Sequence, residues 1–512
     1  MRKMLLFALC AVLILSACST AAPSSSTAVP ITSGSTATSQ EAPAEVKTWT
    51  IMKPYNTTQP PVTDGPIQLA LEEALNIKLD VRYVPTGTFT EVFNTTLSTK
   101  DVPKVIYVPS SLPTNPAFIK YCSSGVFHEL NALIDERPAL FDEGLTAMNS
   151  LTTCAVNDKF YFLANAIAAA RVGVVYREDW RVKVGAPVPN SVENFYEMAR
   201  MFTELDPDGN GKDDTFGFSY VDDGDKELAY AGFTSLAVAH GAPNLWGNVD
   251  GKITPYFETP EYMQTLNYFK DMYDKGYMNN DFYMLNNKTA QIIAGECGMM
   301  MTSATNAATP GGKLDPIIET TPGAALGYIN LFTDPNGNQV INSLVSLGAI
   351  GGPAFPKSST TEEEVGEFLD LIIKTATTPE LDKIDKMGIE GRHYTVENGT
   401  IVMTDAQMTL RQDEAGGGIC PSRIIEKDYG QVLTPIDRIR HELFACEEFA
   451  VEDSSAGKMT GELLQKSTSI ATIISDARVK YIVGEIDEAG FLAAVQAWKD
   501  AGGKDIIDSL NA

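Results

Sequence analysis

Histidine is scarce in this sequence of 512 residues, and the residue patterns that mark common enzymes are missing. No two of the four histidines stand at the spacing of paired metal ligands. The GxSxG elbow of serine hydrolases, the phosphate-binding P-loop and the HExxH motif of zinc proteases are absent as well. The sequence therefore marks no catalytic site. Because acidic residues are numerous, their count does not exclude a pair of catalytic carboxylates of the kind that glycosidases use.

Positive charge is also in short supply. The chain has 39 lysines and arginines against 66 aspartates and glutamates, which gives a formal net charge of −27. Such a chain repels polyanions, so we expect no nucleic-acid partner. The net charge does not by itself select a substrate.

Cysteine is too sparse and too irregular to form a framework. After Cys10 and Cys18 only five cysteines remain, an odd number, and no CxxC or His-paired spacing occurs among them. This excludes a disulfide scaffold and a zinc site. We expect buried free thiols, with a single bridge between Cys122 and Cys154 as the alternative.

The one long apolar run lies at the N-terminus. Arg2 and Lys3 precede it, and it extends from Met4 to Leu15, which is too short for a comfortable membrane span. This pattern is typical of a secretory signal over residues 1–17. The tetrapeptide LSAC that ends it resembles a bacterial lipobox, in which Cys18 would receive a diacylglycerol and anchor the protein to a membrane. A plain signal with a chance cysteine is the alternative.

Residues 18–47 follow as a tether of Ser, Thr, Ala and Pro. The segment 19–46 holds no aromatic residue, lysine or arginine. Such a composition cannot bury enough apolar surface to offset the entropy of ordering the chain, so we expect a flexible tether between the lipid and the body.

The body opens with a pattern of alternating strands and helices. We expect strands at TWTIMKPY, IKLDVRYVP and PKVIYVP, and helices at DGPIQLALEEALN and TFTEVFNTTLSTKD. Asp64 is the expected cap of the first helix and Pro66 its opening residue. This order predicts an α/β fold with helices on the faces of a sheet.

A second α/β unit is expected further along the chain. AARVGVVYREDW predicts a strand, and NSVENFYEMARMFTELD an amphipathic helix with Ser191 or Asn190 as its cap. TPEYMQTLNYFKDMYDKGY and TTEEEVGEFLDLIIKTAT predict further helices, and Met299–Met301 a buried strand. The last helix is expected near EAGFLAAVQAWKDAGG.

The stretch DPDGNGKDDTFGF has the residue spacing of a calcium loop through its ninth position, but Gly217 stands where a twelfth-position glutamate is expected. TFGFSY predicts a strand, whereas a calcium sensor needs a helix that swings. The alternatives are a solvated Asp-Gly turn without metal and a dockerin-type module, which would need a second loop of this kind.

Four blocks carry a family resemblance. Residues 176–218, TPEYMQTLNYFKDMYDKGYMNNDF, AGECGMMM and GIEGRHYTVENG resemble, in this order, blocks of family 1 extracellular solute-binding proteins of ABC importers, closest to the lipoprotein branch with oligosaccharide binders. The resemblance implies a two-lobed, type II periplasmic-binding-protein-like α/β fold. It places residues 48–166 and about 348–400 in one lobe, and residues 170–345 and about 400–512 in the other.

The resemblance also implies a function. A monomer held outside the cell by its lipid would bind a small solute, with a mono- or oligosaccharide favoured, close around it, and dock on an ABC transporter permease. The alternatives are a secreted carbohydrate-active enzyme and a binder of peptides or metal chelates with the same fold.

Relatives that bind alginate oligosaccharides carry a similar acidic loop with a structural calcium. Carried over by position, side-chain oxygens would come from Asp206, Asp208, Asn210 and Asp214, and a backbone carbonyl from Lys212. The departure is Thr215, where a relative has a glutamate, and Asp213 or water would fill that place.

A sugar site needs aromatic rings under pyranose faces and planar polar groups for hydroxyls. Six residues are candidates: Tyr55, Tyr176, Trp180, Trp246, Arg392 and Tyr394. Core packing or a surface loop is the alternative for each of them.

Overall fold

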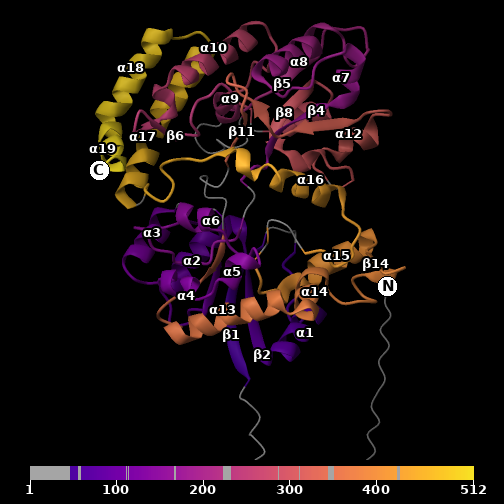
Figure 1. The fold of residues 1–512 in the computed structure, drawn as a ribbon, viewed down its shortest axis with the longest axis vertical. Helices are drawn as coiled ribbons and strands as arrows, with labels where there is room; N and C mark the ends of the chain where they lie inside the picture. The colour runs from indigo at the N-terminus through magenta and orange to yellow at the C-terminus, as the bar shows by residue number, and fades with distance from the viewer. Residues whose placement is uncertain are drawn as a thin grey trace, which may run out of the picture. The chain divides into compact units, whose positions relative to one another are not determined.

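The computed structural model describes residues 46–55, 59–110, 112–113, 115–166, 169–222, 232–285, 287–310, 312–343, 351–421, 423, 427–459 and 461–512. The predicted signal, Cys18 and nearly all of the tether lie outside these residues. The body from Val46 to Ala512 forms one unit that contains two separate sheets of four strands, each with its own hydrophobic core (Figure 1).

The first sheet has the strand order β12-β3-β1-β2. β1 pairs in parallel with β2 along its whole length, from Lys47 opposite Ile77 to Tyr55 opposite Pro85, and β3 joins it in parallel, while β12 is antiparallel at the edge. The elements around this sheet are β1 (Lys47–Tyr55), α1 (Pro66–Leu75), β2 (Ile77–Pro85), α2 (Phe89–Leu97), β3 (Val105–Val108), α3 (Pro116–Ser123), α4 (Asn131–Asp135), α5 (Ala139–Asp142), α6 (Met148–Thr153), β12 (Gly352–Ala354), α13 (Glu362–Thr377), α14 (Pro379–Met387), β13 (Thr395–Glu397), β14 (Thr400–Val402) and α15 (Asp405–Glu414).

The second sheet has the order β5-β8-β4-β9, with β4 antiparallel to both neighbours and β5 parallel to β8. The elements of this part are β4 (Val172–Arg177), α7 (Glu178–Val184), α8 (Val192–Glu204), β5 (Phe216–Ser219), α9 (Phe233–Ala239), β6 (Trp246–Val249), β7 (Lys252–Pro255), α10 (Pro260–Asp274), α11 (Lys288–Ile293), β8 (Cys297–Ser303), α12 (Asp315–Thr320), β9 (Leu326–Ile329), β10 (Phe332–Thr333), β11 (Gln339–Asn342), α16 (Pro435–Phe444), β15 (Ala450–Val451), α17 (Gly461–Ile482), α18 (Glu488–Trp498) and α19 (Lys504–Leu510).

The predicted strand and helix pattern of the body is confirmed, with two corrections at helix ends. Pro66 opens α1 as expected, but the residue in the cap position is Gly65 and not Asp64. The Asp64 backbone instead has a positive φ of 53°, which turns it out of the extended conformation that an N-cap needs. The last helix of the chain is α19 and not the expected α18, because a π-helical turn with a positive φ at Gly502 starts a new segment there.

α8 shows how closely the amphipathic pattern decides the packing of the second core. Ser191 caps it by accepting a hydrogen bond of 3.2 Å from the Asn194 backbone N–H. The side chains that it buries share one face, as the predicted amphipathic helix requires, and are Val192, Phe195, Met198, Ala199 and Phe202. The strands beneath α8 have glycine where the helix comes close. A Cβ atom at Gly298 would lie 2.1 Å from the Phe202 ring, and a Cβ atom at Gly217 would lie 2.3 Å from Ala199. The two glycines therefore let α8 approach the sheet.

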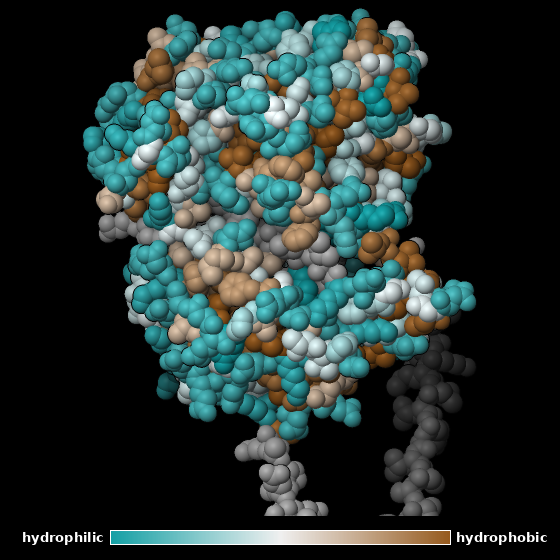
Figure 2. All heavy atoms as spheres, viewed as in Figure 1, coloured by the Kyte–Doolittle hydropathy of each residue, from teal (hydrophilic) through white to brown (hydrophobic). Residues whose placement is uncertain are grey.

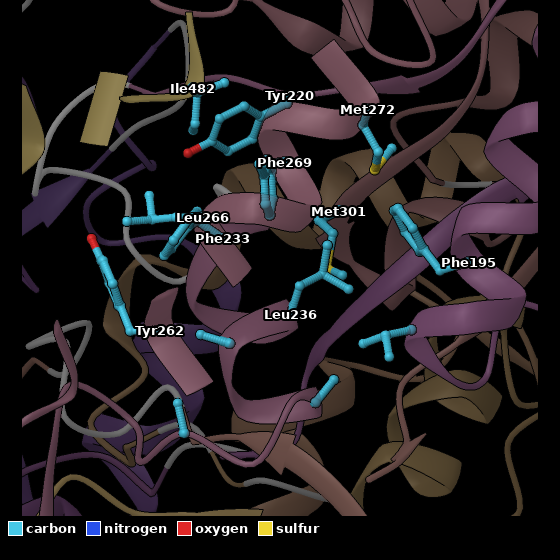
Figure 3. Packing of buried hydrophobic residues seen from close by; sticks show 14 of the residues in the cluster. Phe195, Tyr220, Phe233, Leu236, Tyr262, Leu266, Phe269, Met272, Met301 and Ile482 are labelled. Atoms are coloured by element: carbon cyan, nitrogen blue, oxygen red, sulfur yellow. The ribbon is translucent and has the colours of Figure 1, made fainter. Parts of the chain in front are cut away.

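Aromatic and sulfur side chains fill the second core. Phe233, Tyr262 and Phe269 pack ring against ring with centroids 5.0 Å apart in two successive pairs, and Met301 of β8 lies in the same cluster (Figure 3). The predicted buried strand Met299–Met301 is confirmed, because these side chains are at most 1% exposed. Most of the surface seen in Figure 2 is hydrophilic, with exposed apolar side chains in small groups only.

The cysteines of the described residues are free, as predicted, but Cys154, Cys420 and Cys446 are only partly buried. Cys122 and Cys297 are buried, and none of the five cysteines in the described residues is in a disulfide, so the alternative bridge between Cys122 and Cys154 is not formed. Burial raises the pKa of the Cys154 thiol to about 12, which keeps it protonated and unreactive at neutral pH.

A buried ion pair joins α17 to the second sheet. The Asp222 carboxylate, three residues after β5, receives two hydrogen bonds of 2.6 and 2.7 Å from the Arg478 guanidinium of α17. The Tyr220 hydroxyl donates to the same carboxylate at 2.9 Å, and the guanidinium lies 5.2 Å from the centre of the Phe233 ring. Both charges are more than 90% buried, so each depends on the other for its stabilisation.

We predict that Asp222→Asn lowers the free energy of unfolding by about 3–5 kcal/mol, because it leaves the Arg478 charge buried without a counter-ion. Urea denaturation followed by circular dichroism measures this loss. Asp508→Asn, in the exposed pair with Lys504, is the matched control and should cost less than about 1 kcal/mol. Equal effects of the two substitutions would contradict the prediction.

Candidate functional site

A cavity of about 790 Å³ lies between elements of the first core and α16. Its walls come from the end of α14, from β14, from α15 and the turn after it, and from the N-terminal half of α16, while Lys53 of β1 contributes from the first sheet. In Figure 1 α16 lies above α15, and α14 and β14 lie beside α15 in the lower half of the body. The volume is within the range of about 300–1,000 Å³ that small-molecule sites occupy.

One wall is fixed by the ends of α15. Thr404 and Gln407 form a capping box that starts the helix. Near the other end of α15, Arg411 donates a hydrogen bond of 2.6 Å to the carbonyl oxygen of Lys386, which lies in the last turn of α14. The two helices therefore meet along one edge of the cavity.

The opposite wall is α16, which packs on the helical turn Ala304–Ala307 that follows β8. Thr434 and Asp437 form its capping box, and Pro435 stands at its first position. Ile439 and Leu443 are buried against Ala304 and Ala308 at the end of β8. Since residues three and four apart share a helix face, these contacts turn the neighbouring polar side chains away from the core.

The lining is cationic, in contrast to the rest of the chain. Six lysine or arginine residues and one histidine line the cavity against two aspartates. These residues are Lys53, Lys386, Arg411, Arg423, Arg438, Arg440 and His441.

Both aspartates of the lining are already engaged. Asp385 lies 3.2 Å from the Lys386 ammonium and accepts the Ile419 backbone N–H at 3.1 Å. Asp437 accepts the Thr434 hydroxyl at 2.6 Å and lies 3.3 Å from Arg440. The negative charge of both aspartates is therefore largely neutralised by neighbouring groups of the cavity wall.

Lys53 sits at the base of the cavity in a half-buried position. Its ammonium donates to the Gly418 carbonyl oxygen and lies 4.6 Å from the centre of the Tyr107 ring. Burial lowers the pKa of Lys53 to about 8, an effect that Asp385 opposes and Lys386 reinforces. The Lys53 ammonium group is therefore positioned by a carbonyl oxygen and an aromatic ring, and not by a salt bridge.

Three segments that connect the two parts of the body meet beside β11. The Glu447 carboxylate accepts the backbone N–H groups of Ala169 and Ala170 at 3.0 and 3.1 Å. The Asn244 amide donates to the carbonyl oxygens of Ser343 and Val451, both at 2.9 Å. Side chains therefore hold the connecting segments together, as a hinge between two parts requires.

Tyr55 is a candidate sugar-contacting residue that does not line this cavity, and its ligand role stays a prediction. It ends β1 on the same face as Lys53, because side chains two apart on a strand share a face. Its ring lies 6.5 Å from the Tyr83 ring, and the Tyr83 hydroxyl donates to Gly416 in the turn after α15.

Tyr176, Trp180 and Trp246 lie in the second core. Their side chains are 5%, 2% and 8% exposed, Trp180 packs against Phe202, and Trp246 packs against Trp498 with ring centroids 6.3 Å apart. The structure does not bring them to the cavity. Their role in ligand binding stays a prediction.

Arg392 and Tyr394 lie in the segment between α14 and β13, outside the cavity lining. The Arg392 guanidinium forms two hydrogen bonds with Glu414, the longer 2.7 Å, and His393 contacts the same carboxylate at 3.0 Å. Tyr394 is buried, with the Lys383 ammonium 5.0 Å from its ring centre. These contacts fasten the segment to α15, and the ligand role of both residues also stays a prediction.

The acidic loop is exposed and ordered by its own side chains. Asp206 accepts the backbone N–H groups of Gly209 and Gly211 at 2.9 and 3.1 Å. The Asn210 amide nitrogen donates to Asp208 at 2.7 Å and to Asp214 at 3.0 Å, and therefore stands between carboxylates. Within the described residues no three carboxylate, histidine or cysteine side chains are close enough together to hold a metal ion.

The loop is followed by the strand β5, as expected. The Thr215 hydroxyl, at the position that departs from the relatives, donates to the Phe202 carbonyl oxygen at 2.8 Å and does not face the loop centre.

The cavity residues were not among the sequence candidates. Arg411 lies on α15, and Arg438 and Arg440 lie on α16, with 20 residues between the two helices, so no local spacing groups the three. A local signal does exist, since DRIRHE puts three basic residues into six positions of a very acidic chain.

The comparison with known families decides what kind of protein this is. The family model of the bacterial extracellular solute-binding proteins matches residues 50–378, well over half of the chain. The chain belongs to this family. The resemblance expected from the sequence is thereby confirmed.

Two proteins of Bacillus subtilis (strain 168) are similar to this solute-binding protein over most of their length. Lipoprotein LipO is 28% identical over 486 residues, 93% of each chain. The polygalacturonan/rhamnogalacturonan-binding protein YtcQ is 29% identical over 460 residues, 88% of each chain.

Solved structures show the same fold. The substrate-binding protein FusA of S. pneumoniae in complex with kestose superposes with a TM-score of 0.62 at 16% identity, over 91% of this chain and 98% of FusA. Its EF-hand mutant in complex with fructo-nystose gives the same values. The alginate-binding protein AlgQ2 without calcium gives 0.61 at 18% identity, over 91% of this chain and 97% of AlgQ2. The predicted two-lobed α/β fold of this solute-binding protein is confirmed.

The division of the chain between the lobes at about 400 stays a prediction. The structure places α15 against α1, and Ile419 in the core of the first sheet.

Among the described residues, every helix is too short or too polar to cross a lipid bilayer.

The environment of Lys53 predicts a pH-dependent stability. Its folded pKa of about 8 lies below the ordinary value of 10.5, so between these pH values the unfolded chain binds more protons than the folded chain. The free energy of unfolding of the parent protein, relative to Lys53→Met, should therefore rise between pH 8 and 10.5, by about 1–2 kcal/mol for a half-buried group.

Urea denaturation of both proteins at pH 7.5 and pH 10.5 measures this change, and Lys100→Met, at an exposed lysine, is the matched control. A difference between parent and Lys53→Met that stays constant across the two pH values would contradict the assigned environment of Lys53.

Proposed function

We propose that this protein captures a sugar or oligosaccharide outside the cell and delivers it unchanged to the permease of an ABC transporter. The observation that carries the proposal is a ligand-sized cavity whose walls come from both parts of a family-member solute-binding fold. The printed names of YtcQ and FusA, which describe carbohydrate binders, support a carbohydrate as the solute.

The proposed capture uses closure of the two walls around the ligand. A ligand that contacts α15 and α16 together gains contacts that exist only when the walls approach, so it shifts the population toward the closed form. The bundle of connecting segments held by Asn244 and Glu447 is suited to a hinge, because few chain crossings must change their backbone angles.

We propose binding rather than hydrolysis as the role of the cavity. Asp385 and Asp437 are its only two carboxylates among the described lining residues, and both accept hydrogen bonds from neighbouring groups of the walls. A carboxylate engaged in this way is poorly placed to act as a nucleophile or a general acid.

The proposed site of action is the outer face of a cell membrane. The lipobox-like LSAC at residues 15–18 supports attachment through Cys18, and the relative LipO is named a lipoprotein. Acyl chains buried in a bilayer contribute about 0.8 kcal/mol per methylene group, which keeps the protein near the permease that it would serve.

We predict stoichiometric binding without turnover. When the mature protein is titrated with a panel of mono- and oligosaccharides, at least one should give saturable heat in calorimetry, while chromatography of the same mixtures after prolonged incubation should recover the sugar unchanged. Heat-unfolded protein is the control. A released fragment would favour the secreted-enzyme alternative, and no heat with any sugar would contradict the proposed ligand class.

Calcium is proposed as a structural ion of the acidic loop. Asp206, Asp208, Asn210 and Asp214 would supply side-chain oxygens and Lys212 its carbonyl, a set of hard oxygen donors suited to this ion. The Asn210 amide nitrogen now bridges Asp208 and Asp214, so a donor of positive character already occupies the centre of the donor set. Bound calcium would neutralise the repulsion between these carboxylates.

We predict that calcium raises the melting temperature of the metal-free protein, since a ligand bound only by the folded state adds about 2.7 kcal/mol at 100 times its Kd. Thermal unfolding with calcium chloride or with EDTA measures the shift. Asp214→Ala should abolish it, whereas Asp508→Ala, in the exposed α19, should keep it. An identical melting temperature with calcium and with EDTA would contradict the proposal.

A further inference from the structure

We infer that the cavity between α15 and α16 recognises an aromatic group attached to the sugar, so that its preferred ligands are aryl-substituted sugars. This inference rests on the proposed function and specifies the ligand further. The observation behind it is a mismatch in the lining. Thioether sulfurs and a guanidinium without a partner favour contact with aromatic rings, yet the lining residues that the structure describes include no phenylalanine, tyrosine or tryptophan.

Three methionines line one side of the cavity. Met387 is the last residue of α14, Met403 directly follows β14, and Met408 lies in the first half of α15. All three are partly buried, whereas the three methionines of β8 are at most 1% exposed. Each cavity methionine therefore keeps some surface that a ligand can reach, and its unbranched side chain can adapt to the shape of a flat ring.

The cavity wall itself supplies no ring for these sulfurs. The Tyr107 ring, which does not line the cavity, is 8% exposed and has the Lys53 ammonium 4.6 Å from its centre. A contact between a sulfur atom and the edge of an aromatic ring is favourable. Within the described lining only the ligand can provide such a ring.

The opposite wall adds a cation. The Arg438 guanidinium lies exposed on α16 and forms no hydrogen bond or ion pair with any residue that the structure describes. Both acidic residues of this helix are engaged elsewhere, since Asp437 contacts Arg440 and Glu442 accepts the Tyr328 hydroxyl. A guanidinium stacks favourably on the face of an aromatic ring. An aromatic group between the two helices would therefore meet sulfur on one side and this cation on the other.

A planar polar group for the sugar lies one helical turn from a cavity methionine. Gln412 follows Met408 by four residues on α15, so the two side chains share a face of the helix. The Gln412 amide is exposed, lines the cavity and forms no hydrogen bond with any described residue. It offers donors and an acceptor to sugar hydroxyls beside the thioether that would contact the ring. The spacing on α15 thus fits a sugar with an aryl group bonded to it.

The test must separate contact with an aromatic ring from simple burial of an apolar group, because Val432 and Leu433 also line the cavity. Calorimetry with the mature protein uses β-glycosides of glucose, galactose and xylose, each with a methyl, cyclohexyl or phenyl group on the anomeric oxygen. Cyclohexyl is similar in size to phenyl but has no aromatic face. We expect at least one phenyl glycoside to bind about tenfold more tightly than its methyl counterpart, and about threefold more tightly than its cyclohexyl counterpart.

Methionine oxidation locates the ring without any substitution. Hydrogen peroxide converts accessible methionines to sulfoxides, and mass spectrometry of peptides measures the rate at each position. A saturating phenyl glycoside should slow oxidation of at least one of Met387, Met403 and Met408 by about threefold or more, because the ring covers the sulfur. Met284, which is 71% exposed and lies outside the cavity lining, is the internal control and should oxidise at an unchanged rate.

Matched substitutions assign the preference to the cavity. Met408→Leu removes the sulfur and keeps an apolar side chain of similar size, and Arg438→Gln removes the cation. Each should reduce the preference for phenyl over methyl by about threefold, whereas Gln412→Ala should weaken both glycosides alike. Arg82→Gln, at an exposed arginine of β2 outside the lining, is the control and should change neither affinity. Melting temperatures show whether each variant is folded.

The outcomes separate this inference from the proposed function. If phenyl glycosides bind no more tightly than methyl or cyclohexyl glycosides, if no glycoside binds although free sugars do, or if a saturating phenyl glycoside leaves oxidation of all three cavity methionines unchanged, aromatic recognition in the cavity is wrong while sugar capture stands. If Met408→Leu and Arg438→Gln both behave as Arg82→Gln does, the assigned residues are wrong. If neither glycosides nor free sugars bind, the proposed function itself fails.

Discussion

The packing of α16 on the turn that follows β8 is the contact on which the candidate site depends. Burial of Ile439 and Leu443 against Ala304 and Ala308 orients the whole helix, and the helical repeat then presents Arg438 and His441 to the cavity. Without this contact the cations of α16 would have no fixed position relative to Lys53 and Arg411. A small apolar interface thus sets the electrostatics of a larger polar site.

Each of the two four-stranded sheets is stabilised by its own hydrophobic core. Each sheet is buried within its own cluster of apolar side chains, and the Asp222–Arg478 pair adds a demanding polar contact that fastens α17 to the second sheet. The connecting segments are held by hydrogen bonds from Asn244 and Glu447, and also by Ala450, which packs against both cores.

Much of the fold was predictable from the sequence, because its signals are local. The buried face of α8, the capping residue Ser191, the alternation in β2 and the Met run of β8 follow from periodicity and capping chemistry within a few residues. The site was less accessible. Trp180 and Trp246 have the residue type of a sugar platform, yet they pack in the core, because a large aromatic ring is equally suited to both roles.

The sequence by itself determined the α/β pattern, the membership in a solute-binding family and the acidic loop, since each is written in adjacent residues or in ordered blocks. Only the tertiary structure decided that Lys53, Arg411 and Arg438 share one cavity. They come from β1, α15 and α16, separated by hundreds of residues in one case, and their proximity arises from how two cores fold and meet. A local sequence pattern does not predict that these three residues lie close together, because the chain between them does not fix the distance or the direction from one residue to the next.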